Sequence, residues 1–186
     1  MKSSRRSFLA KAGLVTSASC LSPRWVEAKD LPDNRKIKLR FAIASDLHYG
    51  QSNTPYDEFA EAMVSWINRE KKEKGLDLFF INGDLTQDKA ELLTQLRDKH
   101  LKNLNVPYYC IKGNHDYVDE KPDSPTESWK KVWGYSANNT VVHEDFGFVM
   151  ADTTVAAKSN VYLAADKEWL AGEFKKLKNA PAIFSF

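Results

Sequence analysis

Short apolar runs alternate along this chain with longer stretches in which apolar residues recur every three or four positions. Compact apolar runs are typical of buried strands, whereas the longer spacing is typical of helices with one face on a core. Runs of the first kind predict strands at residues 37–45, 76–82, 106–112, 140–143, 146–151 and 182–186. Stretches of the second kind predict helices at residues 54–75, 88–104, 124–134 and 166–178.

The predicted helices carry recognisable terminal residues. Thr54-Pro55 supplies a capping hydroxyl followed by a proline, whose fixed φ suits the first position of a helix. The run Asp88-Lys89-Ala90-Glu91 has the spacing of a capping box. Gly75 and Gly134 are placed to end their helices.

The elements follow the order β-α-β-α-β-α-β-β-α-β, which predicts an α/β fold of stacked strands and helices. In open sheets of this class, ligands bind beyond the carboxyl ends of the strands. The loops after the first three predicted strands all carry polar side chains, in the segments Asp46-Leu47-His48, Gly83-Asp84 and Gly113-Asn114-His115-Asp116. We therefore expect these side chains to converge on one site.

The donor types in these loops indicate a metal site. Carboxylate, imidazole and amide groups together suit divalent transition metals such as zinc, manganese or iron, and the lack of thiolates argues against a structural zinc site. One carboxylate can bridge two ions about 3.5 to 4 Å apart. Gly83 and Gly113 permit tight turns that deliver the following side chain to the metals.

The three loops resemble the opening motifs of the calcineurin-like metallophosphoesterases, which carry D-x-H, then G-D, then G-N-H-D or G-N-H-E. Here 38 residues separate Asp46 from Asp84, and 30 separate Asp84 from Asn114. Each motif alone is weak, but the ordered set at strand ends is specific. The resemblance covers residues 39–186 and implies an α/β fold of two facing sheets flanked by helices (αββα).

The resemblance also implies how two divalent transition-metal ions (Mn, Fe or Zn) are held. Asp46 and His48 would bind one ion, Asp84 would bridge both, and Asn114 would bind the other. The implied activity is the hydrolysis of phosphomonoesters or phosphodiesters, with a small phosphoester as substrate.

His115 matches the general acid of the family, and Asp116 would hold its ring. The chemistry of the two side chains agrees with that assignment. A histidine with one nitrogen held by a carboxylate presents its other nitrogen to a phosphate or its leaving group.

The family completes its metal site with a further histidine and a G-H-x-H motif, and neither is present in these 186 residues. The final run, Ile183-Phe184-Ser185-Phe186, resembles the strand that leads to the first missing histidine. We therefore expect residues 29–186 to be the N-terminal portion of a metallophosphoesterase domain. This portion by itself should bind metal weakly and hydrolyse little.

Residues 1–28 have the features of a targeting peptide. Arg5 and Arg6 precede Phe-Leu and a small, apolar run, as in twin-arginine signals, which a receptor reads before the folded protein is exported. The expected location is periplasmic or secreted. Lipid anchoring through Cys20 ranks second, because Ser17 stands where a lipoprotein signal usually has an aliphatic residue. We expect no stable membrane span.

The charge of the chain without this leader bears on its partners. Residues 29–186 contain 22 basic and 24 acidic side chains, a net charge of −2. Binding a polyanion through its phosphates needs a basic surface, so we expect no nucleic-acid partner. This balance disfavours an extracellular nuclease. A non-catalytic metal-binding module remains the other alternative, although such a module has no need of His115 and Asp116.

Other polar and aromatic residues have structural interpretations. We expect Asp77 and Asp88 to be structural, Asp152 to form a turn, and His100 to pack against the core. His143 stays open as a substrate contact. We expect the tryptophans at helical spacing to lie in the core rather than to form a stacking platform, namely Trp129, Trp133 and Trp169.

Overall fold

The computed structural model describes residues 36–116, 125–154 and 166–186, so the predicted leader, with Arg5, Arg6 and Cys20, lies outside the described residues. The chain divides into two compact units, Met1–Lys38 and Leu39–Phe186. The second unit contains the elements β1 (Phe41–Ala44), α2 (Tyr56–Lys74), β2 (Leu78–Asn82), α3 (Ala90–Lys99), the 3₁₀ turn η2 (Leu101–Asn103), β3 (Tyr108–Ile111), α4 (Pro125–Trp133), β4 (Asn139–His143), β5 (Phe146–Met150), α5 (Lys167–Lys176) and β6 (Ile183–Ser185).

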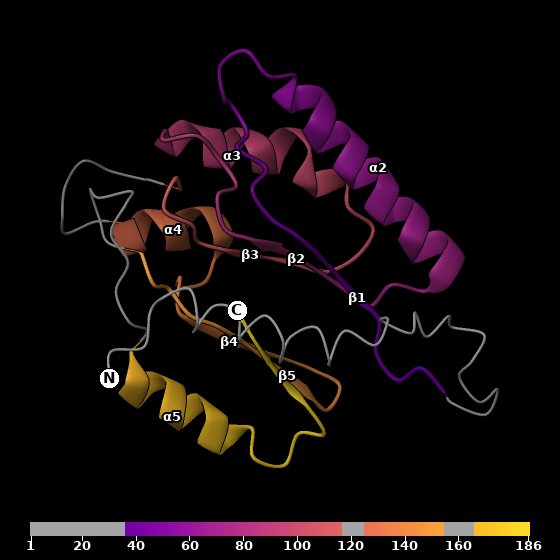
Figure 1. The fold of residues 1–186 in the computed structure, drawn as a ribbon, viewed down its shortest axis with the longest axis vertical. Helices are drawn as coiled ribbons and strands as arrows, with labels where there is room; N and C mark the ends of the chain where they lie inside the picture. Colours follow the sequence, from indigo (N-terminus) through magenta and orange to yellow (C-terminus); the bar gives the residue numbers. More distant parts are fainter. Residues whose placement is uncertain (1–35, 117–124, 155–165) are drawn as a thin grey trace, which may run out of the picture. The chain divides into compact units, whose positions relative to one another are not determined.

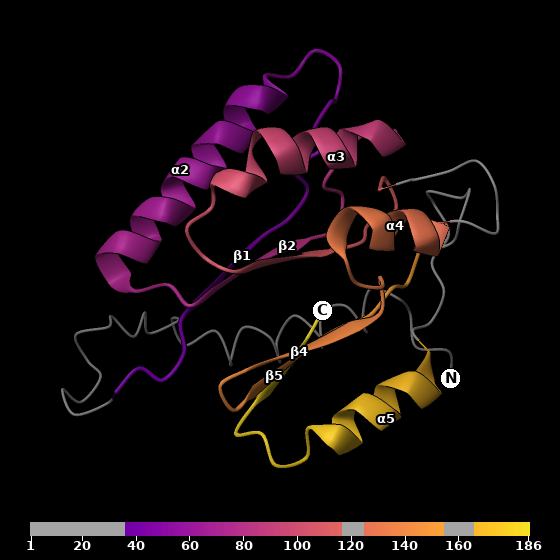
Figure 2. The same ribbon diagram turned by 180° about the vertical axis from the view of Figure 1, so that it is seen from behind.

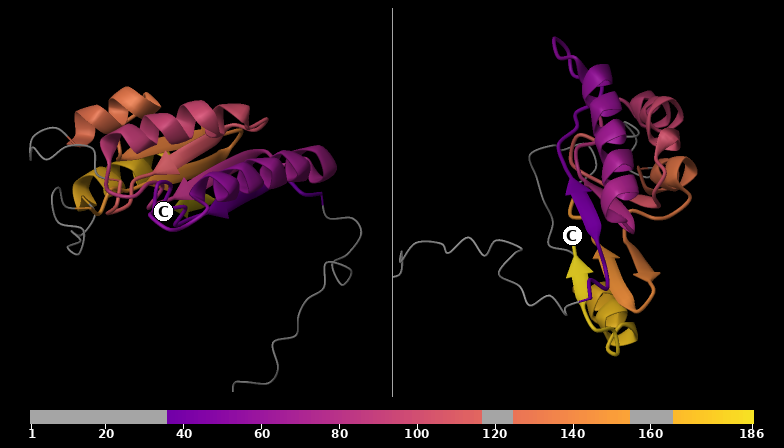
Figure 3. Two further views of the ribbon diagram at one scale, coloured as in Figure 1. Left: turned by 90° about the horizontal axis from the view of Figure 1, so that it is seen from above. Right: turned by 90° about the vertical axis from the view of Figure 1, so that its right-hand side faces the viewer.

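The strands of the Leu39–Phe186 unit form two sheets of three strands. In the first sheet, β1, β2 and β3 are parallel and lie in that order. In the second sheet, β5 pairs antiparallel with β4 and parallel with β6. The sheets face each other, with α2, α3 and α4 outside the first and α5 outside the second (Figures 1 and 2), and the same layers are seen from the side in Figure 3. The predicted αββα architecture is confirmed.

Strand β2 explains why the first sheet has a core on each face. Its side chains alternate between the two faces, as the period of a strand requires. Phe79 and Ile81 belong to the core shared with the helices, whereas Leu78 and Phe80 belong to the core between the sheets. All four are almost completely buried, which matches a continuous apolar run in a central parallel strand.

Aromatic rings fill the space between the two sheets. The ring of Phe80 lies 6.0 Å from that of Phe41, and 4.9 Å from those of Phe148 and Phe186. Burying a side chain of this size contributes about 2 kcal/mol. On the helical side, Trp129 is fully buried and Trp133 packs against the same core, which confirms the core prediction for both.

The predicted helix ends are right at the glycines and wrong at two N-termini. Gly75 ends α2 with φ +71°, and Gly134 follows α4 with φ +78°. The hydroxyl of Thr54 donates to the carbonyl of Gln51 instead of capping α2. No capping box forms at α3, because its N-cap residue is Lys89 and makes no side-chain cap hydrogen bond.

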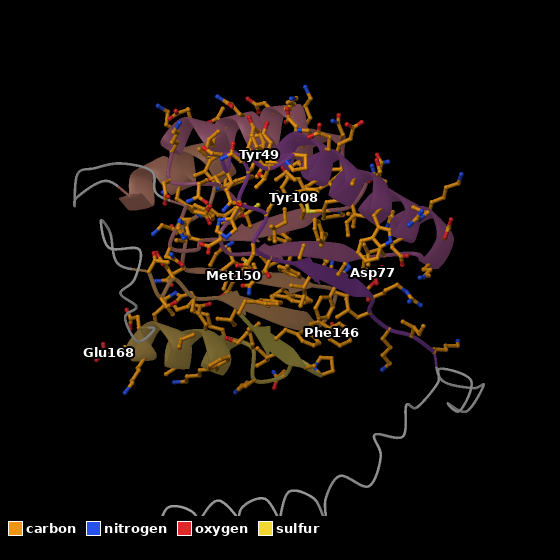
Figure 4. The ribbon with its side chains drawn as sticks, turned by 45° about the horizontal axis from the view of Figure 1, so that its top comes forward. Tyr49, Asp77, Tyr108, Phe146, Met150 and Glu168 are labelled. Atoms are coloured by element: carbon orange, nitrogen blue, oxygen red, sulfur yellow. The ribbon has the colours of Figure 1, made fainter. Side chains whose placement is uncertain are left out.

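Two of the polar residues assigned to structure, Asp77 and His100, make contacts that support the fold. Asp77 accepts a hydrogen bond from the backbone N–H of Arg40 at 2.8 Å, where β2 begins (Figure 4). His100 is buried, as predicted, and its Nε2 lies 2.8 Å from Oδ1 of Asp57. Among the described residues, no helix has the length and apolar character to cross a membrane.

Asp57 is the centre of a polar cluster between α2 and α3. Its carboxylate accepts from the hydroxyl of Tyr49 at 2.8 Å and from Lys99, besides facing His100. The hydrogen bond from Lys99, followed by those of His100 and Tyr49, lowers the pKa of Asp57 well below its usual range. The cluster borders an open pocket of about 640 Å³. Of the residues that line this pocket, only Tyr49, which follows His48, adjoins one of the three strand-end loops predicted to carry function.

Replacing Asp57 by asparagine should therefore lower stability in a pH-dependent way. A carboxyl whose pKa is depressed by folding stabilises the protein above its unfolded pKa of about 3.8, and this contribution is lost as the pH falls towards the folded pKa. Because the side chain of Asp57 is about 40% exposed, screening limits the expected loss at pH 7 to about 0.5 to 1 kcal/mol. Urea unfolding at pH 7 and pH 3 measures it. The control Asp98→Asn, at an exposed ion pair with Arg97, should change little at either pH.

Candidate metal centre

Backbone hydrogen bonds join the three loops that the sequence predicts to carry the site. His48 donates its N–H to the carbonyl of Asp84 at 2.9 Å, and Tyr49 donates to Leu85 at 2.9 Å, so the loops after β1 and β2 run side by side. The loop after β3 joins them, because the N–H of Asp88 donates to the carbonyl of His115 at 3.0 Å. The three loops therefore lie side by side at the carboxyl ends of the strands, as expected.

Gly113 lies where a side chain would collide with the second loop. A Cβ at this position would be 2.1 Å from the backbone nitrogen of Asp84 and 2.3 Å from its Oδ1. Gly83, with φ +75°, lies against Gly113. The two motif glycines therefore permit the G-D and G-N-H-D turns to touch.

Several side chains of the site project from strained backbone. Asp46, His48, Asp84 and Asp88 all have positive φ, at 57°, 44°, 49° and 54°. Left-handed backbone is uncommon for residues other than glycine and persists where the surrounding structure enforces it, often at functional sites. The hydrogen bonds between the loops supply that enforcement, and the strain is concentrated on the loops that carry the predicted ligands.

His48, Asp84 and His115 bring their potential metal-binding atoms within 4.8 Å of one another. Nε2 of His48 lies 3.8 Å from Oδ2 of Asp84. Two atoms that each bind the same ion at about 2.0 to 2.2 Å are at most about 4.3 Å apart, so this pair leaves room for an ion between them. The other oxygen of Asp84, Oδ1, accepts the N–H of His115 at 3.0 Å, which orients the carboxylate. The donors and their spacing fit a divalent metal.

The other two predicted ligands, Asp46 and Asn114, lie in the same loops. Asp46 is exposed, and its backbone N–H donates to the carbonyl of Gly83 at 3.2 Å. Asn114 is half-buried in the turn between Gly113 and His115. Their roles as ligands, like the bridging role of Asp84, stay predictions.

The carboxylate that holds the ring of His115 is Asp88. Oδ1 of Asp88 lies 2.8 Å from Nδ1 of His115. This finding corrects two predictions, since Asp116 was expected to hold the ring and Asp88 to cap a helix. The physical reason is that successive side chains in a turn diverge, whereas Asp88 reaches His115 from the neighbouring loop.

Asp116 instead connects the second and third loops through hydrogen bonds to Thr86 and Gly113. One carboxylate oxygen accepts from the N–H and the hydroxyl of Thr86 at 2.9 and 3.2 Å, and the other accepts from the N–H of Gly113 at 2.8 Å. Its side chain is fully buried. Burial raises the pKa of Asp116 to about 6, against the opposing effect of these backbone hydrogen bonds. Its contacts are those of a residue that shapes the site, and any catalytic role stays a prediction.

The sequence interpretation also missed Gln87 and Lys112. The side-chain amide of Gln87 lies 3.0 Å from Nδ1 of His48 and 3.1 Å from Nδ1 of His115. Lys112 is buried at the end of β3, where its ammonium donates to Thr154 at 2.6 Å and pairs with Asp152 at 3.3 Å, linking the first sheet to the loop after β5. The sequence signal for Lys112 was its place directly after the apolar run of β3 and directly before the G-N-H-D motif.

Asp152 and His143 lie outside the metal group. Oδ1 of Asp152 accepts the N–H of Thr154 at 2.9 Å, the hydrogen bond of an Asx turn, which agrees with its predicted turn-forming role. His143 is half-buried at the end of β4, opposite Phe146. The question of a substrate contact at His143 stays open. Trp169 is half-buried on α5.

A two-sheet α/β fold with carboxylate and imidazole groups gathered at the strand ends defines a metallophosphoesterase type of protein. Residues 39–180 match the family model of the calcineurin-like phosphoesterases. The chain belongs to this family, whose members typically use divalent metals.

Two curated proteins are similar to the chain over part of their length. A 3',5'-cyclic-nucleotide phosphodiesterase of Nostoc sp. is 23% identical over 157 residues, which cover 82% of this chain and 57% of that protein. A protein of Xenorhabdus bovienii, named as a probable cyclic nucleotide phosphodiesterase, is 31% identical over 110 residues, 52% of this chain and 44% of that protein. The chain thus spans about half the length of the curated relatives it matches.

Proposed function

We propose that this protein is a metal-dependent phosphodiesterase acting on a small phosphodiester, with cyclic nucleotides as the first substrate class to test. The observation that carries the proposal is the group formed by His48, Asp84 and His115 at the strand ends. The printed names of the two curated relatives support the choice of substrate class. The net charge of −2 for residues 29–186 supports a small substrate rather than a nucleic acid.

Four residues would hold two divalent transition-metal ions (Mn, Fe or Zn): Asp46, His48, Asp84 and Asn114. When bound, such ions stabilise negative charge on the phosphoryl group and lower the pKa of water. Asp84 suits the central position, because one of its oxygens is held by the backbone N–H of His115 while the other faces His48. The carboxylate is thereby oriented before a ligand arrives.

His115 would donate the proton that the leaving oxygen needs when the phosphoester bond breaks. Asp88 accepts from Nδ1 of His115, so this nitrogen carries a proton and the ring presents Nε2 to the site. The same carboxylate stabilises the protonated ring, in which both nitrogens carry hydrogen, before the transfer from Nε2. Asp116 would keep the loops of Asp84 and His115 in register through its bonds to Thr86 and Gly113.

A hydrolysis panel tests the proposed activity. The full-length protein would be freed of metal by chelation, reloaded with manganese, and assayed against a 3',5'-cyclic nucleotide, an aryl phosphodiester and an aryl phosphomonoester. We expect metal-dependent hydrolysis of the two diesters. Activity on the monoester alone would refute the diesterase assignment, and metal binding without hydrolysis of any substrate would identify a non-catalytic metal-binding module.

His115→Asn should retain metal but slow hydrolysis by about 10²- to 10⁴-fold, the usual loss when a general acid is removed. The effect should be largest for substrates with poor leaving groups, since these depend most on protonation. Turnover of an alkyl and an aryl phosphodiester by the two proteins measures it. An alkyl diester hydrolysed at the wild-type rate would show that His115 is not the acid. The control His143→Asn changes a half-buried histidine outside the metal group.

We also propose that residues 1–28 direct twin-arginine export, so that the protein acts in the periplasm or outside the cell. The support is the Arg5-Arg6 pair followed by a small, apolar run. Replacing both arginines by lysines should block export and leave folding intact, because the receptor reads the arginine pair rather than its charge. Cell fractionation measures the outcome, and unchanged export of the double variant would refute the proposal.

A further inference from the structure

The side-chain amide of Gln87 contacts both histidines of the candidate site and Asp88. Its Oε1 lies 3.0 Å from Nδ1 of His48. Its Nε2 lies 3.1 Å from Nδ1 of His115 and 2.5 Å from Oδ2 of Asp88. One amide therefore lies at hydrogen-bonding distance from both rings and from the carboxylate that holds one of them.

Asp88 determines which way the amide of Gln87 points. An ionised carboxylate only accepts hydrogen bonds, so the atom of Gln87 that faces Asp88 must be the NH₂ group. The carbonyl oxygen of Gln87 then faces His48. Because that oxygen also only accepts, Nδ1 of His48 must carry the hydrogen, and its Nε2 is left with a lone pair directed towards Asp84.

The same rule settles the protonation of His115. Its Nδ1 lies 2.8 Å from Oδ1 of Asp88 and must donate to it. The NH₂ group of Gln87 cannot donate to a nitrogen that already carries hydrogen, so it donates to Oδ2 of Asp88. Gln87 thus orients the carboxylate, and the carboxylate orients His115.

We propose that Gln87 is the positioning residue that fixes the tautomer of His48 directly and the ring of His115 through Asp88. Both rings then present Nε2 to the same site, and their centroids lie 5.1 Å apart. The consequence for metal binding rests on the proposed function, in which His48 is a ligand. Partners that hold the remote nitrogen of a ligand histidine are typically worth about 10- to 100-fold in metal affinity or activity.

Nuclear magnetic resonance of the metal-free protein tests the tautomer without any reaction. With ¹⁵N-labelled histidine, long-range ¹H–¹⁵N spectra at a pH where the rings are neutral show which nitrogen carries the hydrogen. In the wild type we expect the hydrogen on Nδ1 of both His48 and His115. A hydrogen on Nε2 of His48 would overturn the proposal.

Two variants of Gln87 and one control separate its contacts. Gln87→Met keeps the length of the side chain and removes both hydrogen-bonding ends, so His48 should lose its single tautomer and zinc affinity should fall about 10- to 100-fold. Gln87→Glu keeps an oxygen for His48 but cannot donate to Asp88, so the hydrogen should stay on Nδ1 of His48. Gln95→Met, at an exposed position on α3, should change neither readout.

The outcomes distinguish this proposal from the proposed function. Unchanged tautomers and a zinc affinity within about twofold of wild type in Gln87→Met would overturn the role of Gln87, whatever the protein hydrolyses. If Gln87→Met does not fold, Gln87→Glu carries the test, and a hydrogen on Nε2 of His48 in that variant would refute the proposal. A wild type that hydrolyses no phosphoester would refute the proposed function and leave the tautomer result standing.

Discussion

Asp84→Asn should abolish metal binding and hydrolysis together. Asp84 is the carboxylate that faces His48, at 3.8 Å, and in the proposed site it would lie between two cations, where a neutral amide is a poor ligand. The loss in metal affinity should exceed the factor of about 10 to 100 that is typical when only a supporting hydrogen bond is removed. Calorimetric titration with manganese or zinc measures the affinity, and a diester assay measures the rate.

The variant should still fold, which separates a lost ligand from a lost structure. An asparagine oxygen can still accept the N–H of His115, so the turn that Asp84 stabilises is retained. Asp145→Asn, at an exposed position between β4 and β5, is the matched control and should bind metal like the wild type. Wild-type affinity in Asp84→Asn would show that the ions are held elsewhere.

Gly113→Ala should disrupt the site from the backbone. The added Cβ would lie 2.1 Å from the nitrogen of Asp84 and 2.9 Å from the carbonyl carbon of Gly83, and neither backbone atom can move without displacing a motif loop. Overpacking of this kind typically costs about 1 to 3 kcal/mol. Metal affinity should fall at least about tenfold, because Asp84 and His115 are carried by the loops that must separate.

Gly172→Ala is the matched control for this prediction. Gly172 lies inside α5, and a Cβ there would meet no atom within 4 Å. Alanine in a helix interior is more favourable than glycine by about 0.5 to 1 kcal/mol. Thermal unfolding should therefore show opposite shifts for the two variants. Equal stability and metal affinity in Gly113→Ala and the wild type would contradict the close approach of the loops.

The order of the elements could be predicted from the sequence because each element has a local cause. The continuous apolar run at β2 indicates a central strand, and Gly75 and Gly134 end α2 and α4 through a φ that other residues rarely adopt. The caps could not be predicted in the same way. The hydroxyl of Thr54 donates to the carbonyl of Gln51, and the carboxylate of Asp88 accepts from His115. These contacts take the place of the caps that the local sequence predicts.

The site could be predicted as far as its motifs but not in its hydrogen bonding. The family resemblance implied that Asp116 holds His115, yet the partner is Asp88, 27 residues earlier in the chain. Only the pairing of the second and third loops brings them together. Gln87 was overlooked because glutamine is neither a preferred metal ligand nor an acid–base group, and its importance depends on the contact of its amide with both rings.

Zinc titration of the ¹⁵N-histidine-labelled, metal-free protein tests the central claim most directly, because the four histidines of the chain report separately. Zinc is diamagnetic and shifts the resonance of the ring nitrogen that binds it. We predict a saturable shift of Nε2 of His48, with His100, which is held by Asp57, and His143, on β4, unchanged. Zinc-dependent shifts of His100 or His143 with none at His48 would contradict a metal centre at the strand ends.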